Sequence, residues 1–398
     1  MGRAGHAGGA GERSAIVVGG GIGGLAAGAA LARGGWRVRV LERAARFGEV
    51  GAGLSLWPNA LRALDALGVG DQVREQARVE TQAGIRTKSG RWLSRTDTRE
   101  LARRFGPVVM IHRARLFDIL RAALPAGALC ADTRVVGVGL RERWVEVGHG
   151  DGVSRADLLI GADGIGSTVR RSLWPQAPAP RYAGYTAWRF VVDTGERLPA
   201  GGESWGRGER VGIAPLTDGR TYVFCVANAP EGQRGPDGEL AELRRRFGRW
   251  HDPVPRLLAG VEESAVMRHD IYSLPPLASF VTGRAALLGD AAHAMTPNLG
   301  QGANQALEDA VTLAALLDAH PDVESALAAY DEFRRPRTRM IARRSERIGA
   351  VAQWHSAPAA VLRDLMLRMT PASALVDALT PILDWQPPGR DGPTAQAV

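Results

Sequence analysis

The sequence predicts an α/β fold in which a domain built on a parallel sheet is interrupted by an antiparallel sheet and followed by a helical C-terminus. Three observations carry this prediction. Over residues 15–43 an apolar run, a glycine-rich turn, a small-residue helix and an alternating strand follow one another as a βαβ unit. Residues 181–230 contain β-type runs separated by turn residues, without a helix between them. From about residue 323 onward the pattern is mostly helical.

The composition is that of an ordinary globular protein. The chain has 398 residues, of which 45% are hydrophobic and 23% charged, and this length favours two domains or one elaborated domain. The net charge of +8 comes from arginines scattered among Asp and Glu, with Lys88 as the only lysine. Because scattered charges indicate a solvated surface, we expect no nucleic-acid partner and only a weak attraction for anionic substrates or cofactors.

The cysteines and the N-terminus indicate the compartment. Cys130 and Cys225 lie in apolar runs without a C-x-x-C spacing, so we expect small core residues and neither a disulfide nor a metal site. Residues 1–13 are expected to be a disordered tail. The glycines between residues 19 and 24 make the following apolar run a poor signal or membrane segment. The sequence therefore predicts a cytoplasmic protein with no membrane partner.

Periodicity and turn residues define the elements that follow the βαβ unit. A helix is predicted over residues 56–68, entered through Pro58 and Asn59 and closed by Gly68. A hairpin is predicted over residues 134–152, with its turn near Arg143 and Trp144. The other predicted elements are helices over residues 114–124 and 237–259 and short apolar strands over residues 157–164 and 285–290.

The first motif with a chemical meaning is Gly19-x-Gly21-x-x-Gly24, between the first strand and the first helix. Gly19 permits the tight turn, Gly21 lets the backbone approach a pyrophosphate, and Gly24 lets helix and strand pack closely. The helix N-terminus offers unpaired N–H groups to phosphates. Glu42 ends the next strand, where its carboxylate suits ribose hydroxyls and repels a 2′-phosphate. The resident nucleotide is thus FAD or NAD rather than NADP.

Two further strands deliver a carboxylate to the edge of the sheet. Asp163 follows one apolar strand, and Asp290 follows another. Ligands of open α/β sheets bind at this edge. Successive backbone amides at Gly300, Gln301, Gly302, Ala303 and Asn304 lie at a helix start, and such a nest suits a phosphate or the N1–C2=O edge of a flavin.

In these motifs the chain resembles the FAD-dependent aromatic hydroxylases, single-component monooxygenases that include p-hydroxybenzoate, salicylate and urate hydroxylases. The segments GGGIGG with Glu42, GADGIGSTVR and LLGDAAHAMTPNLGQGANQALEDA follow in the right order over nearly the whole chain. VGAGLSLWPNALRAL and IHR, ending at Arg113, are further matches. GYTAW at residues 184–188 and the spacing of 12 between Arg210 and Tyr222 resemble the urate- and 3-hydroxybenzoate-hydroxylase branch.

The resemblance implies a role for each matched residue. Asp290 is expected to hold the ribityl chain of FAD, Glu42 the adenosine ribose, and Asp163 both FAD and the transient NAD(P)H. Pro297 is expected to line the active face of the flavin. The remaining cofactor-binding residues implied are Gly19, Gly21, Gly23, Gly24, Arg43, Ser55, Arg113, Val135 (through its backbone) and the run Gly300, Gln301, Gly302, Ala303 and Asn304. One departure is Arg115, which stands where family members often have an acid and could alter the ion pairing of Arg113.

The resemblance also implies a domain division. The predicted FAD-binding domain comprises residues 1–75, 101–180 and 271–340; the predicted substrate-binding domain comprises residues 76–100 and 181–270; and residues 341–398 form a C-terminal helical region.

The candidates for the substrate side of the site lie in the predicted antiparallel sheet and in the turn before the helix that follows Gly302. Tyr222 and Arg210 lie on neighbouring predicted strands, where a phenol and a guanidinium could converge on an anionic or phenolic substrate, or could form a cross-strand structural pair. Trp188 is either a pocket wall or sheet packing. His293 is expected to pack and hydrogen-bond within its turn rather than to act as a catalytic base. The catalytic candidates are Arg210, Tyr222 and Pro297.

The reaction implied is hydroxylation of an electron-rich aromatic or heteroaromatic molecule by O₂ and NADH or NADPH, through a flavin C4a-hydroperoxide. A flavoenzyme of related fold that epoxidises or otherwise oxidises its substrate is one alternative. An NAD-dependent dehydrogenase explains Gly19–Gly24 and Glu42 but leaves Asp163 and Asp290 unexplained. A flavin-binding protein without turnover is the third. The sequence leaves open the substrate, the choice between NADH and NADPH, and whether the protein is a monomer or a homodimer.

Overall fold

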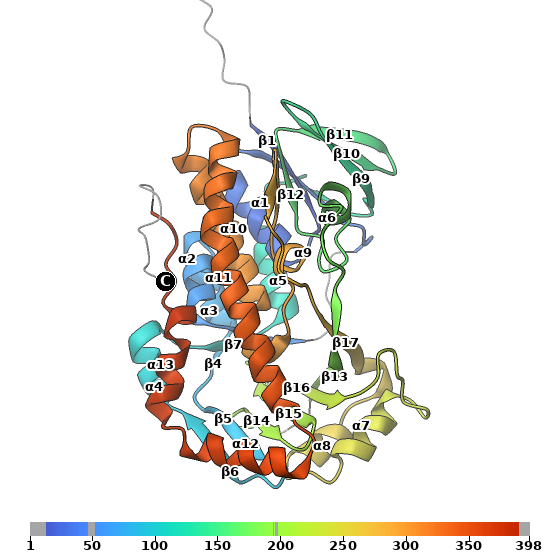
Figure 1. Cartoon of the computed structure of the whole chain (residues 1–398), viewed down its shortest axis with the longest axis vertical. Helices are drawn as coiled ribbons and strands as arrows, with labels where there is room; N and C mark the ends of the chain where they lie inside the picture. Colours follow the sequence, from blue (N-terminus) through green and yellow to red (C-terminus); the bar gives the residue numbers. More distant parts are fainter. Residues whose placement is uncertain (1–12, 47–51, 194, 196–197, 390–398) are drawn as a thin grey trace, which may run out of the picture.

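A parallel sheet with one antiparallel edge strand forms the centre of the nucleotide-binding part (Figure 1). The computed structural model describes residues 13–46, 52–193, 195 and 198–389. Of the tail predicted over residues 1–13, residues 1–12 lie outside the described residues. The strand order is β18-β19-β12-β1-β2-β8, with only the β18–β19 pair antiparallel. The strands are β1 (Ser14–Val18), β2 (Arg37–Leu41), β8 (Leu129–Cys130), β12 (Leu158–Gly161), β18 (Val281–Thr282) and β19 (Ala285–Leu287).

Small residues let the first helix pack closely on this sheet. A Cβ added to Gly28 in the first helix would come within 2.8 Å of Val40 and Leu124, so only glycine fits there. The first helix, α1, also packs against α10, the long helix that follows the Gly300 turn. α10 packs in turn against α2 and against α11, as Figure 1 shows for the α10–α11 pair. The helices are α1 (Ile22–Arg33), α2 (Pro58–Ala66), α3 (Gly70–Gln76), α5 (Arg113–Ala122), α10 (Gly302–Ala319) and α11 (Val323–Ala352).

Two small antiparallel sheets flank the parallel one. The hairpin predicted over residues 134–152 is present and gains a third strand, and α6 (Thr168–Leu173) packs against its first strand. The second small sheet joins the nucleotide-binding part to the antiparallel part. The strands of the first small sheet are β9 (Val135–Leu140), β10 (Val145–His149) and β11 (Gly152–Ala156). Those of the second are β3 (Gly53–Leu56), β4 (Arg78–Val79) and β7 (Val109–His112).

A seven-stranded sheet occupies the other end of the molecule (Figure 1). Its order is β17-β13-β16-β15-β14-β5-β6, antiparallel except for the β14–β5 pair. The sequence predicted one helix over residues 237–259, but Gly248 ends α7 and Pro253 precedes α8, so two helices cover one face of this sheet. The elements are β5 (Ala83–Thr87), β6 (Trp92–Thr96), β13 (Arg181–Val192), β14 (Gly202–Trp205), β15 (Glu209–Pro215), β16 (Thr221–Asn228), β17 (Met267–Ser273), α7 (Glu239–Phe247) and α8 (Val254–Ala259).

Helices close the C-terminal part, as predicted. α12 (Ala357–Met369) and α13 (Ala372–Leu383) follow α11, and α4 (Thr98–Phe105) packs against α13. The segment after α13 has no periodicity, yet it buries Trp385 completely. Arg62 of α2 anchors it by donating to the carbonyl oxygens of Leu383 (2.6 Å) and Trp385 (3.1 Å).

The predicted fold class is confirmed, since a parallel nucleotide-binding sheet, an inserted antiparallel sheet and a helical C-terminus are all present. Within the described part of the chain, no helix is both long enough and apolar enough to span a bilayer.

Candidate functional site

Four parallel strands end at one edge of the six-stranded sheet, and each is followed by a residue that the sequence singled out. Gly19 follows β1, Glu42 follows β2, Asp163 follows β12, and Asp290 follows β19. Because β19, β12, β1 and β2 are neighbours in that order, these residues form a continuous row along the carboxyl ends of the strands. This edge is where open α/β sheets bind their ligands.

The glycines of the first turn differ in what surrounds their Cα atoms. Gly19 has a positive φ of 104°, and a Cβ on it would collide with the backbone of Ala162, the residue after β12. A Cβ on Gly24 would collide with the carbonyl oxygen of Gly19, and one on Gly23 would approach Leu288 to 2.8 Å. By contrast, nothing lies within 4 Å of a Cβ placed on Gly21. Gly21 therefore faces open space at the start of α1, where a ligand can reach the backbone.

These two situations predict two different phenotypes. Gly21→Ala is expected to fold with wild-type stability and to lower FAD affinity about tenfold, because its methyl group enters the space that a pyrophosphate needs. Gly24→Ala is expected to destabilise the fold itself, because the β1–α1 contact must open. Thermal melts of the apoproteins and FAD titrations check both expectations. Equal apoprotein melting temperatures for the two variants would contradict this distinction.

Glu42 is turned towards the glycine loop. Its carboxylate accepts hydrogen bonds from the backbone N–H of Gly20 (2.7 Å) and of Ala44 (2.8 Å). It is half-buried, whereas Arg43 is exposed beside it. Val135 is buried at the start of β9. Glu42 thus holds the loop in place and keeps lone pairs for a further donor such as a ribose hydroxyl.

Asp163 has a structural task that the sequence prediction missed. It accepts hydrogen bonds from the Ser167 hydroxyl (2.5 Å) and from the backbone N–H of Thr168 (2.7 Å) and Val169 (3.2 Å). Ser167 in turn caps the N–H of Arg170 (2.9 Å). The start of α6 is therefore satisfied by protein groups.

Asp290 has no such partner among the residues that the structure describes. It lies deep in the fold, yet solvent reaches its side chain, so it faces a space between the elements. Burial raises the pKa of Asp290, and the charges of His293 and Arg113 oppose this effect only in part. Within the described residues, no hydrogen bond to the Asp290 carboxylate is formed. A hydroxyl donor bound there would stabilise the carboxylate, as the ribityl chain of FAD can.

The turn before α10 is tied to β3 by a single amide. Asn304 accepts from the backbone N–H of Trp57 (2.9 Å) and donates to the carbonyls of Ser55 (3.1 Å) and Gly300 (2.7 Å). Gly300 is left-handed (φ 62°), and a Cβ there would approach the Trp57 indole nitrogen to 3.3 Å. A Cβ on Gly302 would meet nothing within 4 Å, so the helix start opens onto free space.

The residues present fit FAD. α1 and α10 both begin without a side-chain cap, so their first N–H groups remain available, in contrast to the capped α6. Both starts lie beyond strand ends of the same sheet edge. The buried indole N–H of Trp57 has no acceptor among the described residues. Two uncapped helices, an orphaned donor and the Asp290 carboxylate match a long ligand with a pyrophosphate, a polyol and a polar ring edge.

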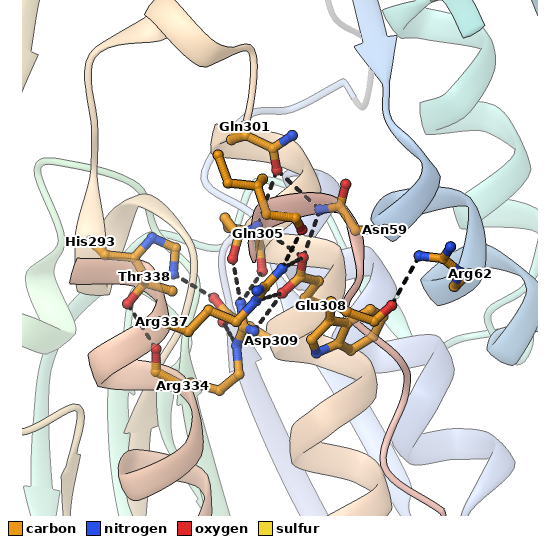
Figure 2. A network of polar contacts seen from close by, with 12 residues as sticks. Asn59, Arg62, His293, Gln301, Gln305, Glu308, Asp309, Arg334, Arg337 and Thr338 are labelled. Atoms are coloured by element: carbon orange, nitrogen blue, oxygen red, sulfur yellow. Dashed lines mark hydrogen bonds and ion pairs between the residues drawn. The ribbon is translucent and has the colours of Figure 1, made fainter. Parts of the chain in front are cut away.

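A buried ionic network beneath this cradle was missed from the sequence (Figure 2). Glu308 and Asp309 of α10 are fully buried and share Arg334 of α11, which donates to both. Arg337 also donates to Glu308 (2.7 Å), and His293 is bonded to Asp309 (2.6 Å). The same Asp309 accepts from the backbone N–H of Gly289 (2.9 Å), so the network fixes the turn that carries Asp290. His293 therefore bonds to α10 and not within its own turn as predicted, and its role as scaffold stays a prediction.

The network makes stability depend on acid pH. Burial alone raises the pKa of Asp309, but the charges of His293 and Arg334 outweigh it and lower that pKa to about 2. A depressed carboxylate pKa contributes stability above the unfolded value of about 4, and this contribution is lost as the pH falls towards 2. We expect the urea midpoint to fall steeply between about pH 4 and pH 2. An Asp309→Asn variant with the same acid slope as wild type would contradict this origin.

Arg210 and Tyr222 lie on the same face of the seven-stranded sheet but do not meet. Arg210 of β15 pairs with Val226, four positions along β16 from Tyr222. Its guanidinium donates to Gln353 (2.9 Å), Glu203 (3.2 Å) and Asn298 (2.8 Å).

The Arg210 contacts reach the turn that carries Pro297, whose ring is exposed next to Asn298. A cavity of about 460 Å³, lined by Tyr185, Thr296 and Gln353 among others, adjoins this contact. At the other end of the face, Tyr222 packs beside Gly53 of β3, where a Cβ would come within 2.6 Å of its ring. Arg210 and Tyr222 therefore mark opposite ends of one surface.

Two other sequence candidates have structural roles. Trp188 is buried on the helix-covered face, where its indole donates to Glu239 (2.7 Å) and its ring packs on Phe247, so it is core and not a pocket wall. Arg115 is exposed, while Arg113 lies near Asp290. The replacement of an acid by Arg115 therefore leaves the Arg113–Asp290 neighbourhood in place.

Comparisons with known proteins agree with this geometry. Residues 12–345 match the family model described as an FAD binding domain. The chain is 42% identical to the aurachin C monooxygenase/isomerase of Stigmatella aurantiaca, over 92% of this chain and 96% of that protein. It is 37% identical to the 3-amino-4-hydroxybenzoate 2-monooxygenase of Streptomyces cremeus, over 89% of this chain and 91% of that protein. The structure of Klebsiella pneumoniae HpxO with FAD and uric acid superimposes with a TM-score of 0.88 at 30% identity, covering 96% of this chain and 98% of that one.

Proposed function

Since the chain belongs to the FAD-binding domain family and is a FAD-dependent monooxygenase, we propose that it hydroxylates a small aromatic or heteroaromatic ring bound between Pro297 and the inner face of the seven-stranded sheet. The observation that carries this proposal is the pairing of a cofactor cradle with the polar, aromatic sheet face that lies opposite α7 and α8. NADH or NADPH supplies the electrons, and O₂ supplies the oxygen atom.

Each part of the chain then has a task. The starts of α1 and α10 and the carboxylates of Glu42 and Asp290 hold the cofactor. Bound FAD supplies the reductive activation of O₂. Asn304 and the Asp309 network keep the Gly300 and Asp290 turns in register, so that Pro297 borders the reacting face.

The sheet face positions the ring and controls its protons. Burial raises the pKa of Tyr222, so its phenol stays protonated and can donate a hydrogen bond to an oxygen substituent of the substrate. Arg210 positions the Pro297 turn through Asn298. The apolar and aromatic neighbours of Tyr222 exclude water from the reacting atoms.

The two cysteines support a reducing compartment. Both are free thiols, and burial raises the pKa of Cys225, which keeps that thiol protonated. We infer a cytoplasmic enzyme from this cysteine usage.

Purified protein is expected to be yellow and to oxidise NADH or NADPH faster when a suitable phenol, aromatic acid or hydroxylated heteroaromatic is added. Under ¹⁸O₂ the product is expected to carry one labelled oxygen, measured by mass spectrometry. Flavin-containing protein that yields only hydrogen peroxide with every ring tested would contradict hydroxylation. Colourless protein that cannot be reconstituted with FAD would overturn the cofactor assignment as well.

A further inference from the structure

One arginine on the inner sheet face, Arg189, has no counter-ion among the described residues. Along β13, Trp188, Phe190 and Val192 belong to the core beneath α7 and α8. Because side chains alternate in a strand, Arg189 points to the opposite, inner face. The register places it beside Phe224 of β16 and Met267 of β17.

An aromatic surface lies directly next to Arg189. The ring of Phe224 covers Gly212 of β15, where any side chain would collide with it. Tyr222 lies beside Phe224, with ring centroids 6.1 Å apart. Solvent reaches Phe224 and Arg189 in part, so neither is sealed in the core. This surface suits the face of an aromatic ring.

The two arginines of this face differ in their partners. Arg210 is fully engaged by Glu203, Gln353 and Asn298, and Glu203 neutralises its charge. Arg189, by contrast, makes no hydrogen bond or ion pair within the described residues, and its Nε is buried without an acceptor. Its charge acts on Arg113, which adds a second positive charge, on the Tyr222 phenol, and on His269, whose pKa is lowered by burial and by the nearby arginines.

A cation whose Nε is buried without an acceptor is costly, and more so beside the like charge of Arg113. Asp290 is the acid that opposes this cluster, and it acts on Arg113. An anionic group on a bound ring would neutralise Arg189 while the ring packs on Phe224.

We propose that Arg189, and not Arg210, binds an anionic oxygen group of the substrate, a carboxylate or an ionised ring hydroxyl, and so selects anionic aromatic substrates. This inference rests on the proposed function. It assigns substrate specificity to the Tyr222 end of the sheet face and leaves Arg210 as a positioning residue for the Pro297 turn.

The test compares an acid with its neutral counterpart on the FAD-loaded enzyme. The probes are 3-amino-4-hydroxybenzoate and 6-hydroxynicotinate, each paired with its carboxamide, and binding is measured from the change in flavin absorption. Wild type is expected to bind at least one acid about tenfold or more tightly than its amide. Arg189→Gln is expected to lose about 10- to 100-fold in acid affinity with little change for the amide, and Arg189→Lys to recover part of the loss.

The control is Arg220→Gln, because Arg220 is paired with Asp218 in the exposed turn before β16. It should bind both probes as wild type does. FAD affinity and melting temperature should be unchanged in Arg189→Gln, since a loss of either would assign Arg189 to the cofactor or the fold and overturn the proposal. Equal binding of acid and amide by wild type, or no response to either acid, would also overturn it. Failure of the proposed function is distinguished by the ¹⁸O₂ experiment, in which no ring tested would give a product with labelled oxygen.

Discussion

Arg334→Met is expected to lower the free energy of unfolding by about 3–5 kcal/mol, because it leaves the buried carboxylates of Glu308 and Asp309 without their shared cation. Arg334 is fully buried and donates to both (Figure 2). Arg337 and His293 remain, but each reaches only one of the two acids. Urea unfolding followed by circular dichroism measures the change.

Arg339→Met is the matched control, because Arg339 is exposed on the same helix. Its effect should stay within about 0.5 kcal/mol. If Arg334→Met fails to fold, adding Glu308→Gln and Asp309→Asn to it should recover soluble protein, since the buried charges are then removed as well. A single Arg334→Met variant as stable as the control would show that the network contributes no net stability.

Asp290→Ala is expected to weaken FAD binding about 10- to 100-fold, the usual loss for a hydrogen bond to a charged acceptor. The fold should be retained, because the Asp290 carboxylate accepts no hydrogen bond within the described residues. Equilibrium dialysis or flavin fluorescence measures the affinity. Asp318→Ala, an exposed acid near the end of α10, should retain FAD as wild type does. Wild-type flavin occupancy in Asp290→Ala would remove that residue from the cofactor site.

The residues at strand ends could be predicted from sequence because their motifs are local. The run from Gly19 to Gly24 predicts a turn and the start of a helix without reference to any other segment. Asp163 and Asp290 each follow shortly after an apolar strand. Their common edge follows from the parallel sheet alone. Asp163 shows the limit of this reasoning, since the motif indicates a ligand residue while the structure adds a role in capping α6.

Pairings between distant segments could not be predicted in the same way. Glu308 and Arg334 lie in different helices, and charged residues in helices usually indicate a solvated face. A signal was present, because α10 is apolar on most sides and therefore had to bury some polar residues. Arg189 carried a similar signal, because it is the one charge in the otherwise apolar second half of β13. The burial of Trp385 had no signal in the sequence. Its segment is held by hydrogen bonds from Arg62 to backbone carbonyl oxygens, which any residue type could provide.

The order of strands in the central sheet also governs when the enzyme can acquire its cofactor. β1 ends at Val18, but its neighbour β12 ends at Gly161, and the next strand, β19, at Leu287. The growing polypeptide therefore cannot complete the cradle until the residues beyond Asn304 have left the ribosome, although the first glycine turn was made long before. FAD then joins segments from both halves of the polypeptide. At a free concentration 100 times its dissociation constant, it adds about 2.7 kcal/mol to the stability of the whole enzyme.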